Sequence, residues 1–141
     1  MENERTQAWV KAAAALVAGV GLLIALAAWP PLAGPVVFAA DLFIWPLDGM
    51  QTLTAPETRV FMGISGGLMV GWGVTLWKLA AYLIPTDAAA VRSITMTGLY
   101  CWFAVDSLAS IMAGVPVNAL GNVGFVVLFL LAFRQGRAAR A

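Results

Sequence analysis

The sequence predicts an all-α integral membrane protein, a four-helix bundle with a long outer loop between its first two helices. Of the 141 residues, 62% are hydrophobic and 11% are charged, whereas a water-soluble domain carries about 25% charged residues. The hydrophobic residues gather in four segments, each long enough to cross a bilayer core, which takes about 20 helical residues. Prolines and glycines separate these segments. We therefore expect residues 1–141 to form a single transmembrane domain.

The first two predicted helices end at prolines. The first covers residues 7–29 and stops before Pro30, which cannot continue a helix because proline lacks an amide N–H. The second covers residues 56–84 and stops at Pro85 for the same reason. The connection between them, residues 30–55, is the predicted outer loop.

The last two predicted helices form a hairpin. The third covers residues 87–114, because Thr86 and Asp87 are both suitable N-cap residues. The fourth covers residues 116–133 and follows a turn that contains Gly114. Because this turn is so short, we expect the third and fourth helices to be antiparallel neighbours.

The basic residues predict the orientation, since cytoplasmic loops of membrane proteins carry an excess of lysine and arginine. Four spans place both termini and the connection after residue 84 on one side. That side carries Arg5, Lys11, Lys78, Arg92, Arg134, Arg137 and Arg140, whereas Arg59 lies toward the other side. We therefore expect cytoplasmic termini and, for a bacterial protein, a location in the inner membrane.

The outer loop contains an apolar stretch around Trp45 that is too short to span a bilayer. One interpretation is a segment that rests among the lipid headgroups, with Trp45 as an interface anchor. The other is a re-entrant lid over the mouth of the bundle. We expect Asp41 and Asp48 to face water in this loop.

The second predicted helix carries a stripe of glycines at Gly63, Gly67 and Gly71, which Gly66 and Gly73 widen. Glycine costs about 1 kcal/mol in a helix interior, and small residues allow membrane helices to approach closely. The stripe therefore predicts helix packing. The partner is either the first helix, through small residues such as Gly21 and Ala25, or another protein chain.

Asp106 lies about 12 Å below the outer end of the third helix, at a rise of about 1.5 Å per residue. A charged residue at this depth costs roughly 3 kcal/mol, so it must face the bundle interior. The same depth arithmetic predicts its polar neighbours, which are Asn118, Asn122, Ser65 and Ser110. Two interpretations remain: hydrogen bonding that holds helices together, or a binding site for a ligand or proton.

Composition argues against several classes of function. The chain has no histidine and a single cysteine, Cys101, so neither haem nor zinc is expected and no cofactor or metal site is predicted. Net charge is +1, which gives no basic field for nucleic acid. The P-loop, GxSxG and HExxH motifs are absent from the sequence, and no catalytic residue is predicted.

Two functional hypotheses follow. The first is a non-enzymatic accessory or assembly subunit that packs, as a homo-oligomer or in a larger membrane complex, through the glycine-rich second helix. The second is a small transporter, or a membrane protein that binds a lipid, quinone or ion at the polar cluster around Asp106.

The order of the spans, the long first outer loop and the glycine-rich second helix, Gly63 to Gly73, together resemble the small four-helix bacterial membrane proteins of the DoxX-like family. The resemblance concerns layout and not a diagnostic motif. It implies a membrane protein of poorly defined function, in some cases linked to quinone or redox systems, and it assigns no residue a role.

Overall fold

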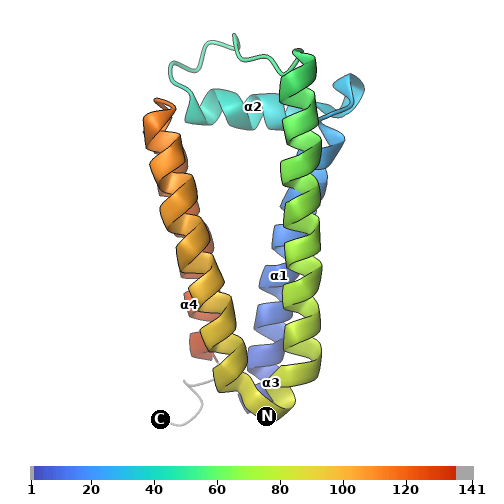
Figure 1. Cartoon of the computed structure of the whole chain (residues 1–141), viewed down its shortest axis with the longest axis vertical. Coiled ribbons are helices and arrows are strands. Elements are labelled where there is room, and N and C mark those ends of the chain that lie inside the picture. The colour runs from blue at the N-terminus through green and yellow to red at the C-terminus, as the bar shows by residue number, and fades with distance from the viewer. Residues whose placement is uncertain (1, 136–141) are drawn as a thin grey trace. The chain divides into compact units, whose positions relative to one another are not determined.

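A computed structural model describes residues 2–135, which form four α-helices and one short 3₁₀ helix, with no strand in that range. The predicted all-α class is therefore confirmed. Arg137 and Arg140, two of the predicted cytoplasmic cations, lie outside the described residues. In chain order the elements are α1 (Glu2–Leu26), η1 (Pro30–Leu32), α2 (Gly34–Phe43), α3 (Pro56–Met112) and α4 (Pro116–Gln135) (Figure 1).

The helices α1, α3 and α4 are long and apolar enough to cross a membrane. The chain divides into two compact units that each take part of α1 and part of α3. The first unit comprises the residues up to Ala15 and those from Val74 onward, and the second comprises Leu16–Gly73.

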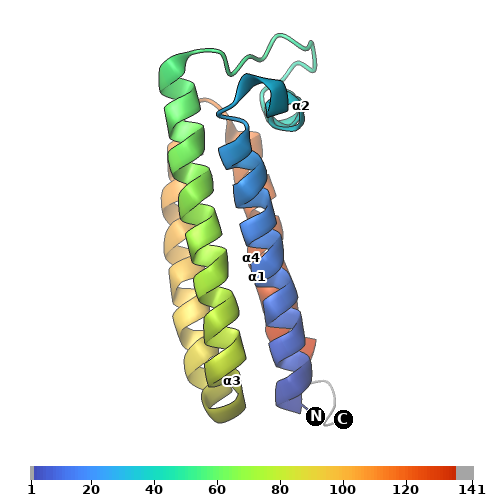
Figure 2. The same cartoon turned by 90° about the vertical axis from the view of Figure 1, so that its right-hand side faces the viewer.

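In the first unit, α3 reverses direction. Its 57 residues contain one residue with non-helical dihedral angles, Asp87, at φ −148° and ψ 76°. Figures 1 and 2 show the ribbon turning back on itself between its green and yellow parts. The Asp87 carboxylate Oδ1 accepts the backbone N–H of Ala90 at 2.8 Å, so the predicted N-cap is confirmed. Two helical arms, 56–86 and 88–112, result from this break.

The prediction that the second helix stops at Pro85 is wrong, because the helix continues through it. Proline offers no N–H to the carbonyl four residues earlier, which belongs to Ala81. Gln7 of α1 supplies the missing donor: its Nε2 donates to the Ala81 carbonyl at 2.9 Å and to the Ala80 carbonyl at 3.1 Å. The freed carbonyl is thus satisfied, and the break moves to Asp87.

The end of α3 is a Schellman motif. Gly114 adopts φ +80°, a left-handed conformation that glycine tolerates without steric cost. The N–H of Val115 donates to the Ser110 carbonyl at 2.9 Å, and the N–H of Gly114 to the Ile111 carbonyl at 3.0 Å. The predicted turn at Gly114 is therefore confirmed, and α4 begins at Pro116 as expected.

The first unit has an apolar core whose side chains come from all three of its helices. Its buried residues include Val10, Ala13, Ala14, Leu76, Ala80, Ile84, Val91, Met96, Leu99, Phe129, Ala132 and Phe133. Among these, Phe129, Ile84 and Leu99 are the largest that are fully buried. This core ties the start of α1 to both arms of the α3 reversal and to the end of α4.

In the second unit, α1 and α3 approach at two glycines. A Cβ atom added to Gly66 would lie 2.5 Å from the Gly21 carbonyl oxygen, and one added to Gly21 would lie 2.8 Å from the Gly66 carbonyl oxygen. Each backbone thus occupies the space of the other's missing side chain, which is close packing of the small-residue kind. Ala25 takes part, since its backbone is the nearest neighbour of Gly66.

The first helix, one of the two predicted partners of the glycine-rich helix, is thus in contact with it through Gly21 and Ala25, but at Gly66 and not at Gly63, Gly67 or Gly71. A Cβ at any of these three positions would meet no atom within 4 Å. The reason is helical geometry: Gly66 faces α1, and residues one position away on a helix point about 100° apart. The close packing is thus made by Gly66, which widens the stripe, and not by Gly63, Gly67 and Gly71.

The outer connection is partly helical. Within the second unit, α2 runs across the axes of α1 and α3 rather than along them (Figures 1 and 2). At ten residues it is too short to cross a bilayer. The expectation that Asp41 faces water is wrong, because it is 9% exposed and its Oδ1 accepts the N–H of Gly49 at 3.1 Å. The chain after α2 therefore folds back onto the helix, whereas Asp48 is exposed as expected.

Candidate functional site

The second arm of α3 and the helix α4 lie antiparallel, as predicted, and meet in successive pairs. Trp102 packs edge-on against Phe125, with ring centroids 5.8 Å apart and planes at 83°. One turn further along α3, Asp106 meets Asn122. Another turn further, Ser110 meets Asn118. Each step moves forward on α3 and backward on α4, so an aromatic pair lies beside two polar pairs.

The polar pairs form one hydrogen-bonded network. Both asparagines donate to the same carboxylate oxygen, Asp106 Oδ2, at 3.0 Å from Asn118 Nδ2 and 2.6 Å from Asn122 Nδ2. The second amide proton of Asn118 goes to Ser110 Oγ at 2.9 Å. The second amide proton of Asn122 goes to Ser107 Oγ at 3.2 Å. We call these five residues the Asp106 network.

Helix geometry explains why these residues meet. On α3, Asp106, Ser107 and Ser110 lie on one face, because positions three and four apart in a helix are neighbours. On α4, Asn118 and Asn122 are one turn apart. The Gly114 turn sets the register, since it brings the first turns of α4 beside the last turns of α3.

The Asp106 network is partly buried, and it contains hydrogen-bond acceptors without a donor among the described residues. Asn122 is 5% exposed and Ser107 8%, whereas Asp106 is intermediate. Among the described residues, Asp106 Oδ1 accepts no hydrogen bond. Because both asparagine amides have spent their protons, Asp106 Oδ1 remains as an acceptor, and the two serine hydroxyls, which accept from the asparagines, each keep an O–H proton. Such a group suits a proton, a hard cation or a ligand with N–H or O–H donors.

The network offers no catalytic pair and no cage for a transition metal. Its side chains are one carboxylate, two amides and two hydroxyls, without a histidine or thiol that would activate a nucleophile. Across residues 2–135, no three side chains of His, Cys, Asp or Glu gather in a metal-binding arrangement.

The structure brings together four of the five predicted site residues, Asp106, Asn118, Asn122 and Ser110. Ser65 belongs to the second unit, is exposed, and donates its hydroxyl proton to the Phe61 carbonyl of its own helix at 2.6 Å. Depth along a helix axis suggested it, but depth does not say which way a side chain points.

Sequence reasoning missed Ser107, a buried member of the network. The sequence does contain a signal for Ser107. It lies three residues before Ser110, and Asp106 lies four residues before Ser110, so all three share a helical face.

Comparison of the chain with protein-family models, with curated proteins and with solved structures finds no match. The resemblance in layout to DoxX-like proteins stays a prediction.

Proposed function

We propose that this chain is a non-enzymatic, multi-pass membrane protein that acts as an accessory or assembly subunit. Its partner helix, from a second copy or from a larger membrane complex, packs on the face formed by Gly63, Gly67 and Gly71, which we call the glycine face. The observation that carries the proposal is that Gly63 and Gly67 face open space.

Placement in a membrane is supported by length, hydropathy and surface. Three helices qualify as membrane spans, and the Asp87 break divides α3 into arms that each exceed the roughly 20 residues a bilayer needs. Large apolar side chains are exposed along these helices, including Leu22, Leu68, Val105 and Leu120. Exposing so much apolar surface to water is unfavourable, and monomeric soluble proteins rarely do so. Four crossings, with both termini in the cytoplasm beside Arg5 and Arg134, would solvate all of it with lipid.

The proposed role of the glycine face follows from the low helix propensity of glycine. Each glycine in a helix interior lowers helix stability by about 1 kcal/mol relative to alanine. At Gly66 the close contact with α1 compensates for this cost. At Gly63 and Gly67 the chain itself supplies no such contact within 4 Å. A partner helix that approaches this face would supply it, through the small-residue packing that drives association in lipid.

The test compares two leucine substitutions at glycines with equal space around them. Gly67→Leu covers the glycine face, whereas Gly19→Leu, the control, alters α1 where a Cβ also meets nothing within 4 Å. We expect both variants to fold. Only Gly67→Leu should lose the oligomer or the co-purifying membrane protein after mild-detergent purification, judged by native electrophoresis and mass spectrometry. Retention of the same complex by Gly67→Leu would contradict the proposal.

A second candidate function is ligand or proton binding at the Asp106 network, which would make the chain a small transporter or a lipid-, quinone- or ion-binding protein. The specific observation in its favour is that two amides hold Oδ2 in place while Oδ1 accepts no hydrogen bond from the described residues. A carboxylate so held is pre-oriented for a third group. Placing an ionisable residue inside a membrane segment also costs free energy, and such residues commonly mark ion, proton or substrate sites.

The test is infrared spectroscopy of the carboxyl group in the purified protein. Sodium, lithium and a soluble quinone analogue are added separately. We expect one of them to shift a carboxyl band that Asp106→Asn abolishes while preserving assembly and thermal stability. Absence of a shift with all three would reject this second function and leave the network as structural hydrogen bonding between helices.

A further inference from the structure

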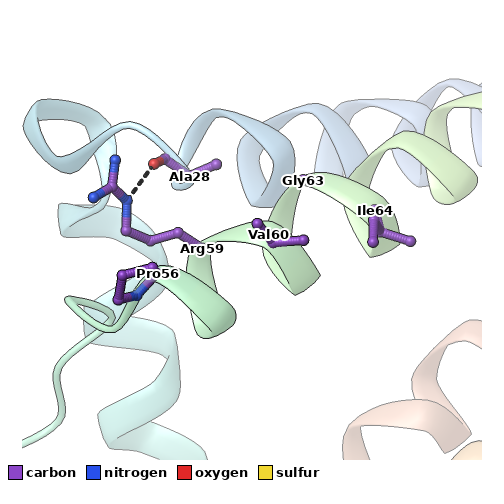
Figure 3. A pocket seen from close by; sticks show the side chains of 6 residues that line it. All are labelled: Ala28, Pro56, Arg59, Val60, Gly63 and Ile64. Atoms are coloured by element: carbon purple, nitrogen blue, oxygen red, sulfur yellow. Dashed lines mark hydrogen bonds between the residues drawn. The ribbon is translucent and has the colours of Figure 1, made fainter.

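An open apolar groove lies in the second unit beside the first turns of α3. Its walls are formed by Ala28, Pro56, Arg59, Val60, Gly63 and Ile64, and its volume is about 520 Å³ (Figure 3). Five of these residues are apolar or lack a side chain, so the groove suits hydrocarbon. Arg59 is the exception, and it lies near the end where α3 begins.

Arg59 is held in a defined position. Its Nε donates to the Ala28 carbonyl, which follows the end of α1, at 2.9 Å, and the residue is half-buried (Figure 3). The terminal guanidinium nitrogens keep their own N–H donors, since an arginine side chain has five. Among the described residues, none places a carboxylate within ion-pair distance of Arg59. The cation therefore lacks a counter-ion from the part of the chain that the structure describes.

The remainder of the groove is apolar and open. Val60 is 59% exposed and Ile64 is 52% exposed. Gly63 lies between them and leaves space where another residue would place a side chain. Moving along α3 from Arg59, the surface thus changes from one oriented cation to hydrocarbon within two helical turns.

We propose that this groove binds an anionic phospholipid. The phosphodiester accepts hydrogen bonds from the Arg59 guanidinium, and one acyl chain lies along Val60, Gly63 and Ile64. Guanidinium groups match phosphate oxygens in geometry and charge, and α3 begins here, so its N-terminal dipole also favours an anion. The inference rests on the membrane placement proposed above and not on the glycine-face partner, which packs at Gly67 and Gly71 where the acyl chain occupies the space at Gly63.

Charge and shape together favour a lipid over the other occupants. A free phosphate would use Arg59 but leave the apolar walls uncovered. A partner helix would cover the walls but bring no anion of its own unless an acidic residue happened to lie there. An anionic phospholipid has both features in the right order, a negative headgroup followed by hydrocarbon.

The experiment is native mass spectrometry of the full chain released from detergent micelles, with three probes added in turn. The probes are phosphatidylglycerol, phosphatidylcholine and inorganic phosphate. For the unmodified protein we expect retention of phosphatidylglycerol, weaker retention of phosphatidylcholine, and no competition from inorganic phosphate at matched concentration. Equal retention of the two lipids would overturn the proposal, as would full displacement of lipid by phosphate.

Two variants act on different parts of the groove. Arg59→Gln removes the cation, and we expect phosphatidylglycerol to bind about tenfold more weakly, because the phosphate loses charge-assisted hydrogen bonds. Gly63→Leu fills the apolar part and leaves the Arg59 bond to Ala28 intact, so it tests the site even if Arg59→Gln unfolds the second unit. We expect a comparable loss from Gly63→Leu. Unchanged affinity in either folded variant would overturn the proposal.

The matched control is Gly67→Leu, the same substitution one turn further from Arg59 and outside the groove lining. It should retain phosphatidylglycerol with unchanged affinity, even though the glycine-face proposal expects it to lose its partner. The two proposals therefore fail separately. Lipid loss in Gly67→Leu equal to that in Gly63→Leu would show that the effect is not local to the groove, and would overturn the lipid site.

Discussion

Adjacent glycines on α3 should respond in opposite directions to the same substitution. Gly66 packs against the backbone of α1, whereas Gly67 faces open space. We expect Gly66→Ala to destabilise the fold and Gly67→Ala to stabilise it slightly. Because both variants add one methyl group to the same helix, the difference between them isolates the helix contact.

The magnitude follows from the distances. A methyl group at Gly66 would lie 2.5 Å from the Gly21 carbonyl oxygen and 2.7 Å from the Ala25 Cα, whereas ordinary contact begins near 3.4 Å. The obstructing atoms belong to helical backbone, so the helices must separate by roughly 1 Å, and overpacking of this kind costs about 1–3 kcal/mol. Replacing glycine with alanine also raises helix stability by up to about 1 kcal/mol in both variants. The two variants should thus differ by about 1–3 kcal/mol.

The assay is reversible unfolding in mixed micelles of a mild detergent and dodecyl sulfate, followed by circular dichroism and by tryptophan fluorescence. We expect the transition of Gly66→Ala to move to lower dodecyl sulfate and that of Gly67→Ala to stay in place or move higher. Equal free energies of unfolding for the two variants would refute the reasoning, because they would mean that α1 and α3 do not approach at Gly66.

Three further predictions concern the ends and breaks of the helices. Gln7→Leu removes the donor that satisfies the Ala81 carbonyl and should lower the free energy of unfolding by about 0.6–1.7 kcal/mol, the range for hydrogen bonds between membrane helices. In a Pro85→Ala background, which restores the helical N–H, unfolding curves should show a smaller loss from the same Gln7→Leu substitution. Asp87→Ala removes the N-cap of the second arm of α3 and should cost about 0.5–2 kcal/mol, with faster amide exchange in that arm and not in α4. Gly114→Ala forces alanine into a left-handed conformation and should lower stability by about 1–2 kcal/mol in thermal unfolding, whereas Gly114→Asn should cost less; equal melting temperatures for these two variants would contradict the assignment.

The amino-acid sequence was sufficient for the features that depend on local chemistry. Pro56 and Pro116 mark the starts of α3 and α4 because proline is tolerated at the first turn of a helix. Asp87 and Gly114 mark a break and an end because one caps a helix and the other adopts a left-handed conformation. The antiparallel pairing that joins Asp106 to Asn118 and Asn122 followed from the short turn between their helices.

The tertiary structure alone decided which way side chains face. The long helices of this chain are apolar on most sides, so hydrophobic periodicity does not distinguish the packed face of a helix from its outer face. For this reason Gly66, and not the glycine face beside it, meets α1, and Ser107 rather than Ser65 joins Asp106. Where α3 passes through Pro85, the donor to the freed Ala81 carbonyl is Gln7, a residue far away in sequence, and only the fold brings it there.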